Sequence, residues 1–134
     1  MFTTTAQRGA VVLPANERTQ GWYGVMRGLV KISGRATAGR RSDFLGVAQG
    51  EWFGEGAVLK NELRRYEVVA LRDTELLCLP SDVFHHLHAS SLAFNQSVVA
   101  CLNLRLSQAM AMIEAGRTRS PEQRIALPLS RLSW

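Results

Sequence analysis

The sequence is poor in the residues that build metal centres and disulfide frameworks. Its 134 residues include two cysteines, Cys78 and Cys101, and neither belongs to a CxxC pair. Zinc sites and iron–sulfur clusters usually take their cysteines from such pairs, so neither kind of site is indicated. Both cysteines lie in apolar segments, which favours buried, reduced thiols in a cytoplasmic protein over a disulfide.

Signals for export and for membranes are also missing. The first ten residues, MFTTTAQRGA, lack the hydrophobic core of a signal peptide. We expect no apolar run to be long enough to span a bilayer. The sequence therefore predicts a soluble, cytoplasmic protein with no membrane partner.

Enzyme motifs are absent as well. There is no glycine-rich nucleotide loop, no nucleophile elbow and no pair of carboxylates with an evident role. His85, His86 and His88 lie close together, but a short helix brings at most two of them to one face, and ordinary helix-end residues are the favoured interpretation. The predicted strands carry no histidine, which disfavours a metal-dependent jelly-roll enzyme. We therefore expect no catalytic residue and no metal ligand.

The bulk composition is that of one folded domain. Nearly half of the residues are apolar, at 46%, and the length suits a single core. The net charge is +5, with arginines concentrated between 35 and 41 and between 117 and 131. The positive residues as a whole are scattered along the chain, so a solvated surface is favoured over a nucleic-acid-binding face.

The first two thirds of the chain alternates short apolar segments with turn signals. Trp22–Met26 and Leu29–Ser33, separated by Arg27 and Gly28, predict a hairpin. A second hairpin tip is expected at 34–41, and further strands at 11–13, 43–47, 66–70 and 74–79. Short strands at such regular spacing favour an antiparallel jelly-roll barrel.

After Ser81 the hydrophobic period becomes helical. Ser81 is a good N-cap for a short helix over 82–88, and a long helix is expected from Ser90 or Ser91 to about Ala115. One apolar seam of this helix advances in steps of three and four, which is typical of a coiled coil and predicts a dimer interface. That seam comprises Val99, Leu102, Leu106, Ala109, Ile113 and Gly116.

A second stripe on the long helix, formed by Phe94, Val98 and Cys101, is expected to pack on the barrel. The alternative is one wide stripe that packs entirely on its own barrel. Beyond this helix, Ser120 to Gln123 is a strong helix start, with a serine cap and a proline in the first helical position. Pro128 interrupts the helix that follows, so the segment predicts the first element of a further domain.

These features together resemble the sensory domain of the CRP/FNR family of bacterial transcription regulators. The most specific parts are Phe53-Gly54-Glu55, with Arg64 nine residues after Glu55, and the segment from Ser120 to Leu129. The resemblance covers about residues 8–131. It implies a mainly β fold with C-terminal helices, in which an antiparallel jelly-roll barrel is followed by a long dimerisation helix. The implied regions are a jelly-roll effector-sensing domain at 8–90, a dimerisation helix at 91–117 and the start of a DNA-binding domain at 120–134.

In the resembling proteins that bind cyclic nucleotides, the Phe53-Gly54-Glu55 segment opens a phosphate-binding cassette. A glycine lets the backbone approach a ligand, a short helix from about Gly56 points amide groups at an anion, and an arginine clamps the phosphate. By resemblance Glu55 binds the ribose hydroxyl and Arg64 the phosphate. The implied effector is a cyclic nucleotide, cAMP or cGMP, and no other cofactor is implied. The expected ligand-binding residues are Gly54, Glu55, Gly56, Ala57, Arg64, Arg65 and Tyr66.

The sequence departs from the family pattern at two places. Small residues usually follow the phosphate-binding arginine, but Arg65 and Tyr66 occupy these positions here. The helix positions where cyclic-AMP-responsive members recognise adenine fall near Ala109 and Met110, which offer no directed hydrogen bond. Two interpretations stay open: a sensor of a cyclic nucleotide or another phosphorylated ligand, and a ligand-free interaction and dimerisation module whose degenerate cassette is filled by Tyr66 or Arg65.

The resemblance implies a regulatory rather than an enzymatic function. The chain would be the effector-sensing and dimerisation part of a transcription regulator, and the long helix would pass the signal to a DNA-binding domain that is absent from these residues. We expect a homodimer through residues 91–117 and contact with DNA only through that missing C-terminal domain.

Overall fold

The computed structural model describes residues 1–34 and 44–118. The expectations for the second hairpin tip and for the helix start at Ser120 therefore lie outside the described residues. The strands are β1 (Phe2–Ala6), β2 (Val11–Leu13), β3 (Gly21–Arg27), β4 (Leu29–Gly34), β5 (Phe44–Ala48), β6 (Trp52–Phe53), β7 (Tyr66–Ala70) and β8 (Thr74–Pro80). The helices are α1 (Glu55–Lys60), α2 (Ser81–Ser90) and α3 (Leu92–Thr118).

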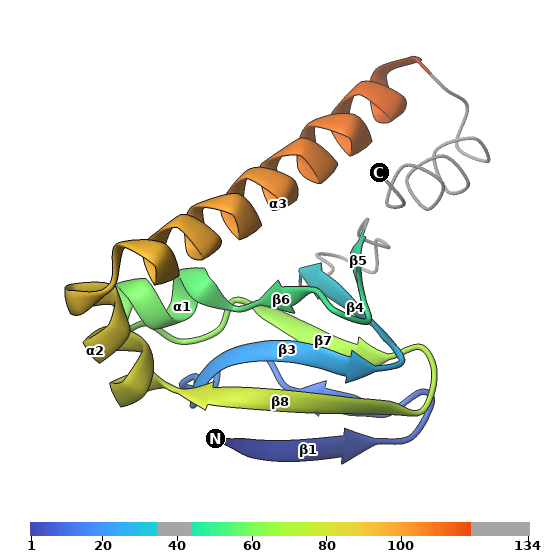
Figure 1. Cartoon of the computed structure of the whole chain (residues 1–134). Helices are drawn as coiled ribbons and strands as arrows, with labels where there is room; N and C mark the ends of the chain where they lie inside the picture. The colour runs from blue at the N-terminus through green and yellow to red at the C-terminus, as the bar shows by residue number, and fades with distance from the viewer. Residues whose placement is uncertain (35–43, 119–134) are drawn as a thin grey trace.

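The strands form two four-stranded antiparallel sheets, in the orders β1-β8-β3-β6 and β2-β7-β4-β5. The two sheets are stacked as layers; α1 and α2 lie at one end of them, and α3 starts at that end and runs diagonally away above the sheets (Figure 1). This confirms the predicted fold class, a mainly β jelly roll followed by a long helix, although the sheets remain two layers and do not close into a barrel.

The predicted hairpin between Trp22–Met26 and Leu29–Ser33 is wrong. These segments form β3 and β4, which belong to different sheets: β3 pairs with β8 and β6, whereas β4 pairs with β5 and β7. The chain turns a corner between them at Gly28, whose φ is +101°. A Cβ atom at Gly28 would lie 2.4 Å from the Thr74 hydroxyl oxygen, so this corner requires glycine on both conformational and steric grounds.

A hydrophobic core lies between the two sheets. Inward-pointing residues of β2 to β8 supply this core. The buried members of this core are Leu13, Tyr23, Val25, Val30, Val47, Phe53, Val68, Leu76 and Cys78.

A second apolar cluster joins the sheets to the helices. Its centre is Trp22 of β3, whose ring lies 4.6 Å from Trp52 and 5.6 Å from both Phe84 of α2 and Phe94 of α3, measured between ring centroids. Val58 of α1 is buried in the same cluster. The cluster therefore holds α1, α2 and α3 against the end of β3, and it fixes where the cassette lies.

The helix starts differ in part from the sequence prediction. Pro80, rather than Ser81, is the N-cap of α2. At the start of α3 the Ser91 hydroxyl accepts a hydrogen bond from the Phe94 amide at 3.1 Å, so Ser91 is the serine that caps the long helix.

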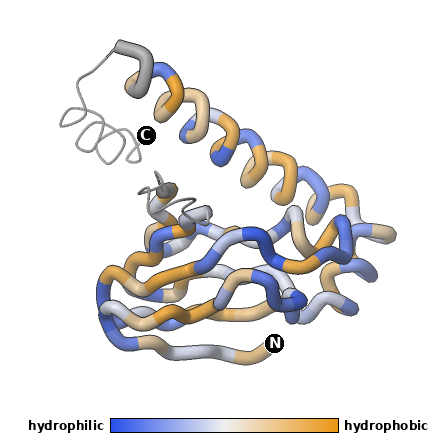
Figure 2. The backbone as a smooth tube through the Cα atoms, turned by 180° about the vertical axis from the view of Figure 1, so that it is seen from behind, coloured by the Kyte–Doolittle hydropathy of each residue, from blue (hydrophilic) through white to orange (hydrophobic). Residues whose placement is uncertain are grey.

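Two faces of α3 have different environments. Phe94, Val98 and Cys101 pack in the cluster around Trp22, which confirms the predicted inner stripe. The outer stripe is exposed: Leu106 and Ile113 have exposed fractions of 58% and 59%. A single stripe that packs wholly on its own domain is therefore excluded, and Figure 2 shows apolar residues recurring along the helix.

The length and composition of α3 also bear on membranes. Leu92–Ala115 is long and apolar enough, by these two criteria alone, to cross a bilayer, which was not expected from the sequence. Core helices of soluble proteins pass the same test, and α3 carries Arg105 and Glu114 within this stretch.

Candidate functional site

Glu55 is the first residue of α1 and directly follows Gly54 in the sequence, and only 6% of it is exposed. Gly54 is the N-cap and has a φ of +93°, a left-handed conformation that favours glycine. The Trp22 indole N–H donates a hydrogen bond to Glu55 Oε1 at 3.1 Å. The other carboxylate oxygen, Oε2, has no hydrogen-bond partner among the described residues. One oxygen of this carboxylate is thus held by the protein and the other remains free to accept.

Arg64 lies between α1 and β7 and is 3% exposed. Its Nη1 donates to the Pro14 carbonyl oxygen at 2.8 Å. No carboxylate lies within ion-pair distance of Arg64 in the described part of the chain. Arg64 is therefore a buried guanidinium that has no negative partner within residues 1–34 and 44–118.

Tyr66, the first residue of β7, lies among these charges. A Cβ atom at Gly54 would be 3.7 Å from the Tyr66 hydroxyl oxygen, so this hydroxyl lies next to the cassette glycine. Burial raises the pKa of Tyr66 above its ordinary value of 10.0; the Glu55 charge adds to this, and the guanidinium groups of Arg64 and Arg105 oppose it. Glu55, Arg64 and Arg105 therefore all lie close enough to Tyr66 to influence it.

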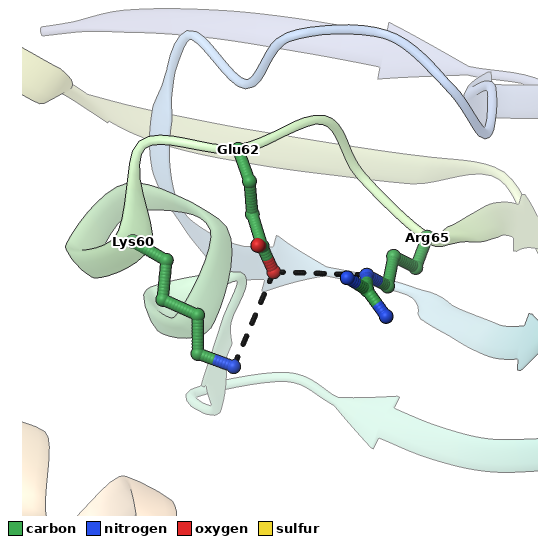
Figure 3. A network of polar contacts seen from close by, with 3 residues as sticks. All are labelled: Lys60, Glu62 and Arg65. Carbon is green, nitrogen blue, oxygen red and sulfur yellow. Dashed lines mark ion pairs between the residues drawn. The ribbon is translucent and has the colours of Figure 1, made fainter.

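Arg65 points away from this group. Its side chain is 84% exposed, and Nε lies 3.7 Å from Glu62 Oε1, which also lies 4.0 Å from Lys60 Nζ (Figure 3). An exposed network of this kind contributes little to stability. The structure brings together Gly54, Glu55, Arg64 and Tyr66, and leaves Arg65 at the surface.

The remaining cassette residues, Gly56 and Ala57, occupy the first turn of α1. The first hydrogen bond within this turn runs from the Val58 amide to the Gly54 carbonyl oxygen, at 3.4 Å. The amide groups of Glu55, Gly56 and Ala57 precede it and have no partner within the helix.

The long helix contributes two side chains to this group: Cys101, which the sequence placed only in the inner stripe, and Arg105, which it did not single out. Cys101 Sγ lies 3.1 Å from the Trp52 carbonyl oxygen and 3.3 Å from Glu55 Oε1, and its one S–H can donate to either. Arg105 Nη2 donates to the same Trp52 carbonyl at 2.6 Å. These contacts join α3 to the segment that immediately precedes Gly54.

The two cysteines are both free thiols. Burial, followed by the charge and hydrogen bond of Glu55, raises the pKa of Cys101 from 9.0 to about 12, while Arg105 opposes the increase. Cys101 is consequently a protonated hydrogen-bond donor at neutral pH rather than a reactive thiolate.

The three histidines lie on α2, where His88 Nδ1 is 2.6 Å from Asn95 Oδ1 and the Asn95 amide donates to the His88 carbonyl at 2.8 Å. His88 thus joins α2 to α3. Within residues 1–34 and 44–118, no group of three or more His, Cys, Asp or Glu side chains could hold a metal ion.

The chain belongs to the cyclic nucleotide-binding domain family, whose model matches residues 3–91. Among solved structures it is similar to the catabolite activator protein of Thermus thermophilus, with 26% identity and a TM-score of 0.69 over 84% of this chain and 53% of that one. It is also similar to a CRP/FNR-family transcriptional regulator from the same species, with 26% identity and a TM-score of 0.75 over 98% of this chain and 65% of that one. The resemblance to CRP/FNR sensory domains expected from the sequence is thereby confirmed.

A third similar structure is an EAL enzyme in its cAMP-bound form, with 22% identity and a TM-score of 0.61 over 84% of this chain and 30% of that one, a level that shows a shared fold. No curated protein sequence matches the chain. The chain spans about half to two thirds of the length of the two Thermus proteins.

Proposed function

We propose that this chain is the effector-sensing and dimerisation part of a CRP/FNR-type transcription regulator, and that its effector is a cyclic nucleotide. The observation that carries the proposal is Arg64, a buried guanidinium with no carboxylate partner among the described residues. A buried charge without a counter-charge is strongly unfavourable. A ligand phosphate supplies that counter-charge and accepts two parallel hydrogen bonds from the guanidinium.

The charge around Tyr66 supports a singly charged ligand. Arg64 and Arg105 are positive and Glu55 is negative, so one positive charge remains uncompensated. The phosphodiester of a cyclic nucleotide carries one negative charge, which balances this group. Glu55 Oε2 is free to accept from a ribose hydroxyl, and the cAMP-bound form of the similar EAL enzyme supports the same ligand class.

The exposed outer stripe of α3 supports the proposal that two copies pair through residues 91–117. Val99, Leu106 and Ile113 recur at spacings of seven and are each more than half exposed. A seam of large apolar side chains exposed to water is unfavourable for a lone chain, and a second copy offers the matching seam. Ala109 and Gly116 lie on the same seam, where small residues allow close helix approach.

Signal transfer follows from the contacts between the cassette and α3. Glu55 would bind the ligand and also contacts Cys101 of α3. Ligand binding at Glu55 would therefore change how α3 is held against the sheets. DNA contact belongs, on this proposal, to a further domain of a transcription regulator that begins at about residues 120–134.

The test is a thermal-shift and calorimetric titration with cAMP, cGMP, cyclic di-GMP and linear nucleotides. At one hundred times its dissociation constant, a ligand specific for the folded state adds about 2.7 kcal/mol of stability. We expect a cyclic nucleotide to shift the melting temperature of the wild-type chain and to have no effect on Arg64→Ala.

The matched control is Arg65→Ala, because Arg65 neighbours Arg64 in sequence but is exposed and paired with Glu62. This variant should bind as the wild type does. Circular dichroism of both variants checks that they are folded. Equal binding by wild type and a folded Arg64→Ala variant would contradict the proposal, as would the absence of binding for every nucleotide tested.

A ligand-free interaction module is the second candidate, and one observation favours it. The Tyr66 hydroxyl lies beside Gly54, where family members usually have a small residue in place of tyrosine. If the aromatic side chain closes the site, no nucleotide should bind to the wild type, and Tyr66→Ala should create binding.

A further inference from the structure

The open edge of β1 (Phe2–Ala6) is a surface that the proposed function leaves unused. β1 is the outermost strand of its sheet: it pairs with β8 on one side and, within residues 1–34 and 44–118, with no strand on the other. Alternate amide and carbonyl groups of its backbone face this open side and can pair with a further strand. Such an edge attracts a partner unless the sequence protects it.

β1 lacks the features that protect an edge strand. Its five residues, FTTTA, include no charge, no proline and no glycine, and phenylalanine and threonine favour extended strands. They pair with β8 in one unbroken register, so no bulge twists the edge away. The other edge strands differ: β6 has two residues, β2 has three and a register shift, and β5 carries Gly46 at its centre.

Phe2 adds an apolar contact to this edge. It lies directly opposite Cys78 of β8, a member of the core between the sheets, so the two side chains are on the same face of the sheet. Phe2 is nevertheless 39% exposed, because no described strand follows β1 on its open side. A strand added there would cover the ring and extend the core.

A second copy of β1 fits this edge. Antiparallel pairing of two identical strands is symmetric, because a register that places residue i opposite residue j also places j opposite i. A register centred on Thr4 places Phe2 opposite Ala6, so a large side chain meets a small one. It also places Thr3 opposite Thr5, and threonine pairs across strands are favourable. Since all five residues are neutral, no charge faces a like charge.

The position of β1 lets this contact coexist with pairing through α3. β1 lies on one side of the sheets and α3 on the other in both views (Figure 1 and Figure 2). Two symmetric contacts on opposite sides of a chain join dimers into a closed group of four or into a longer filament.

We propose that β1 is a second interface between copies of this chain, through which dimers linked by α3 associate by antiparallel pairing of their edge strands. The contact spans five residues of each copy, against the 27 residues of α3, so it forms at higher concentrations than the pairing of the helices. It requires no nucleotide, and in this respect it goes beyond the proposed function.

The test is sedimentation velocity of the full chain over a series of concentrations. We expect the wild type to pass from dimers to larger assemblies and Thr3→Lys/Thr5→Lys to stop at dimers. In the proposed register each lysine faces a lysine of the second copy, which should raise the dissociation constant of the larger assembly by about tenfold or more. Both threonines are exposed in the single chain, so this variant should fold as the wild type does, which thermal unfolding checks.

Two further variants make the test specific. Thr3→Lys/Thr5→Glu changes the same two positions, but the antiparallel register now places lysine opposite glutamate, so larger assemblies should form about as readily as in the wild type. Gln49→Lys/Ala100→Lys is the charge control. It adds two positive charges at exposed positions outside β1, in the turn between β5 and β6 and on α3, and should leave the assembly unchanged.

The inference is overturned if the wild type and Thr3→Lys/Thr5→Lys reach the same size at every concentration. It is also overturned if Thr3→Lys/Thr5→Glu dissociates as readily as the variant with two lysines. A failure of the pairing through α3 gives a different result: the wild type then stops at two copies, and Thr3→Lys/Thr5→Lys remains a monomer. Nucleotide binding is measured separately and does not enter either outcome.

Discussion

Tyr66 is the residue on which the two candidate functions differ most sharply. Its hydroxyl lies beside Gly54, among Glu55, Arg64 and Arg105, and forms no hydrogen bond with the described residues. In a ligand-binding site it donates to the phosphate, so we expect Tyr66→Phe to weaken nucleotide binding by about tenfold, in line with a hydrogen bond to a charged group. The unliganded melting temperature should hardly change, because no protein partner is lost.

Calorimetry and thermal unfolding of Tyr66→Phe provide both readouts. Binding that is as tight as in the wild type, or tighter, would show that Tyr66 obstructs the site rather than serving it. Tyr66→Ala distinguishes these cases further, since it removes the ring as well as the hydroxyl.

Trp22 is the residue whose loss should cost the most stability. Its ring is buried against Trp52, Phe84 and Phe94, and its N–H holds Glu55. We expect Trp22→Ala to lower the free energy of unfolding by about 3–5 kcal/mol, the usual range for a large core aromatic. Urea denaturation measures this, with the exposed Met26→Ala as a control that should change it by less than about 0.5 kcal/mol. A similar small effect for Trp22→Ala would mean that the helices are held elsewhere.

At the scale of single residues, the sequence predicted Glu55 and Arg64 as a pair because a family motif places them nine residues apart. It could not predict that Cys101 and Arg105 contact the cassette. Cys101 lies 46 residues from Glu55, and Arg105 lies 53 residues from Trp52. Such contacts depend on how α3 crosses the cassette, and no local pattern records that crossing.

At the scale of elements, the long helix carries the prediction on assembly. If the outer stripe pairs two copies, a charge at its centre must be buried at the interface, which is strongly unfavourable. We expect Leu106→Asp to convert a dimer into a monomer, as measured by analytical ultracentrifugation or by light scattering after size exclusion. Ala100→Asp is the control, because it adds the same charge at an exposed position about 120° around the helix from Leu106.

Two outcomes would contradict the predicted dimer. One is a wild-type chain that remains monomeric at the highest concentration tested. The other is a Leu106→Asp variant that associates as strongly as the wild type and the Ala100→Asp control.

The sequence predicted some helices and strands correctly and others wrongly or not at all. The inner stripe of α3 was predicted correctly because helical periodicity directly indicates which residues share a face, whereas the outer stripe is exposed and its role as a dimer interface stays a prediction. The supposed hairpin of β3 and β4 was wrong because alternation indicates that a segment is a strand but not which sheet it joins. The threonine-rich strand β1 (Phe2–Ala6) was not predicted at all, since its stability comes from pairing with β8 rather than from its own pattern.

At the scale of the whole molecule, the resemblance to a family supplied what periodicity could not, namely the jelly-roll class of the sheets and the place of the cassette in the chain. The two sheets divide the strands so that β6 and β7, which flank the cassette, lie in different layers. Arg64 and Glu55 therefore both lie near Tyr66, where the layers and the helices come together. This explains why one cluster around Trp22 both stabilises the fold and positions the carboxylate.

The last prediction also concerns the whole fold, through its response to alkaline pH. Four weak acids are raised in pKa by burial, and one of them is Cys101, whose pKa rises from 9.0 to about 12. The others are Tyr23, Tyr66 and Cys78. Since the unfolded chain releases these protons first, the stability they confer is fully present below the unfolded pKa values and is lost as pH rises towards the folded ones.

We therefore expect the free energy of unfolding to be nearly constant from about pH 7 to about pH 8.5 and to fall progressively above about pH 9. Urea denaturation at a series of pH values measures this fall, and tyrosinate absorbance should appear only as the chain unfolds. Tyr66→Phe removes one of the four groups and should make the fall less steep. Stability that stayed constant to about pH 11 would mean that these side chains are better hydrated than their burial between the sheets and helices implies.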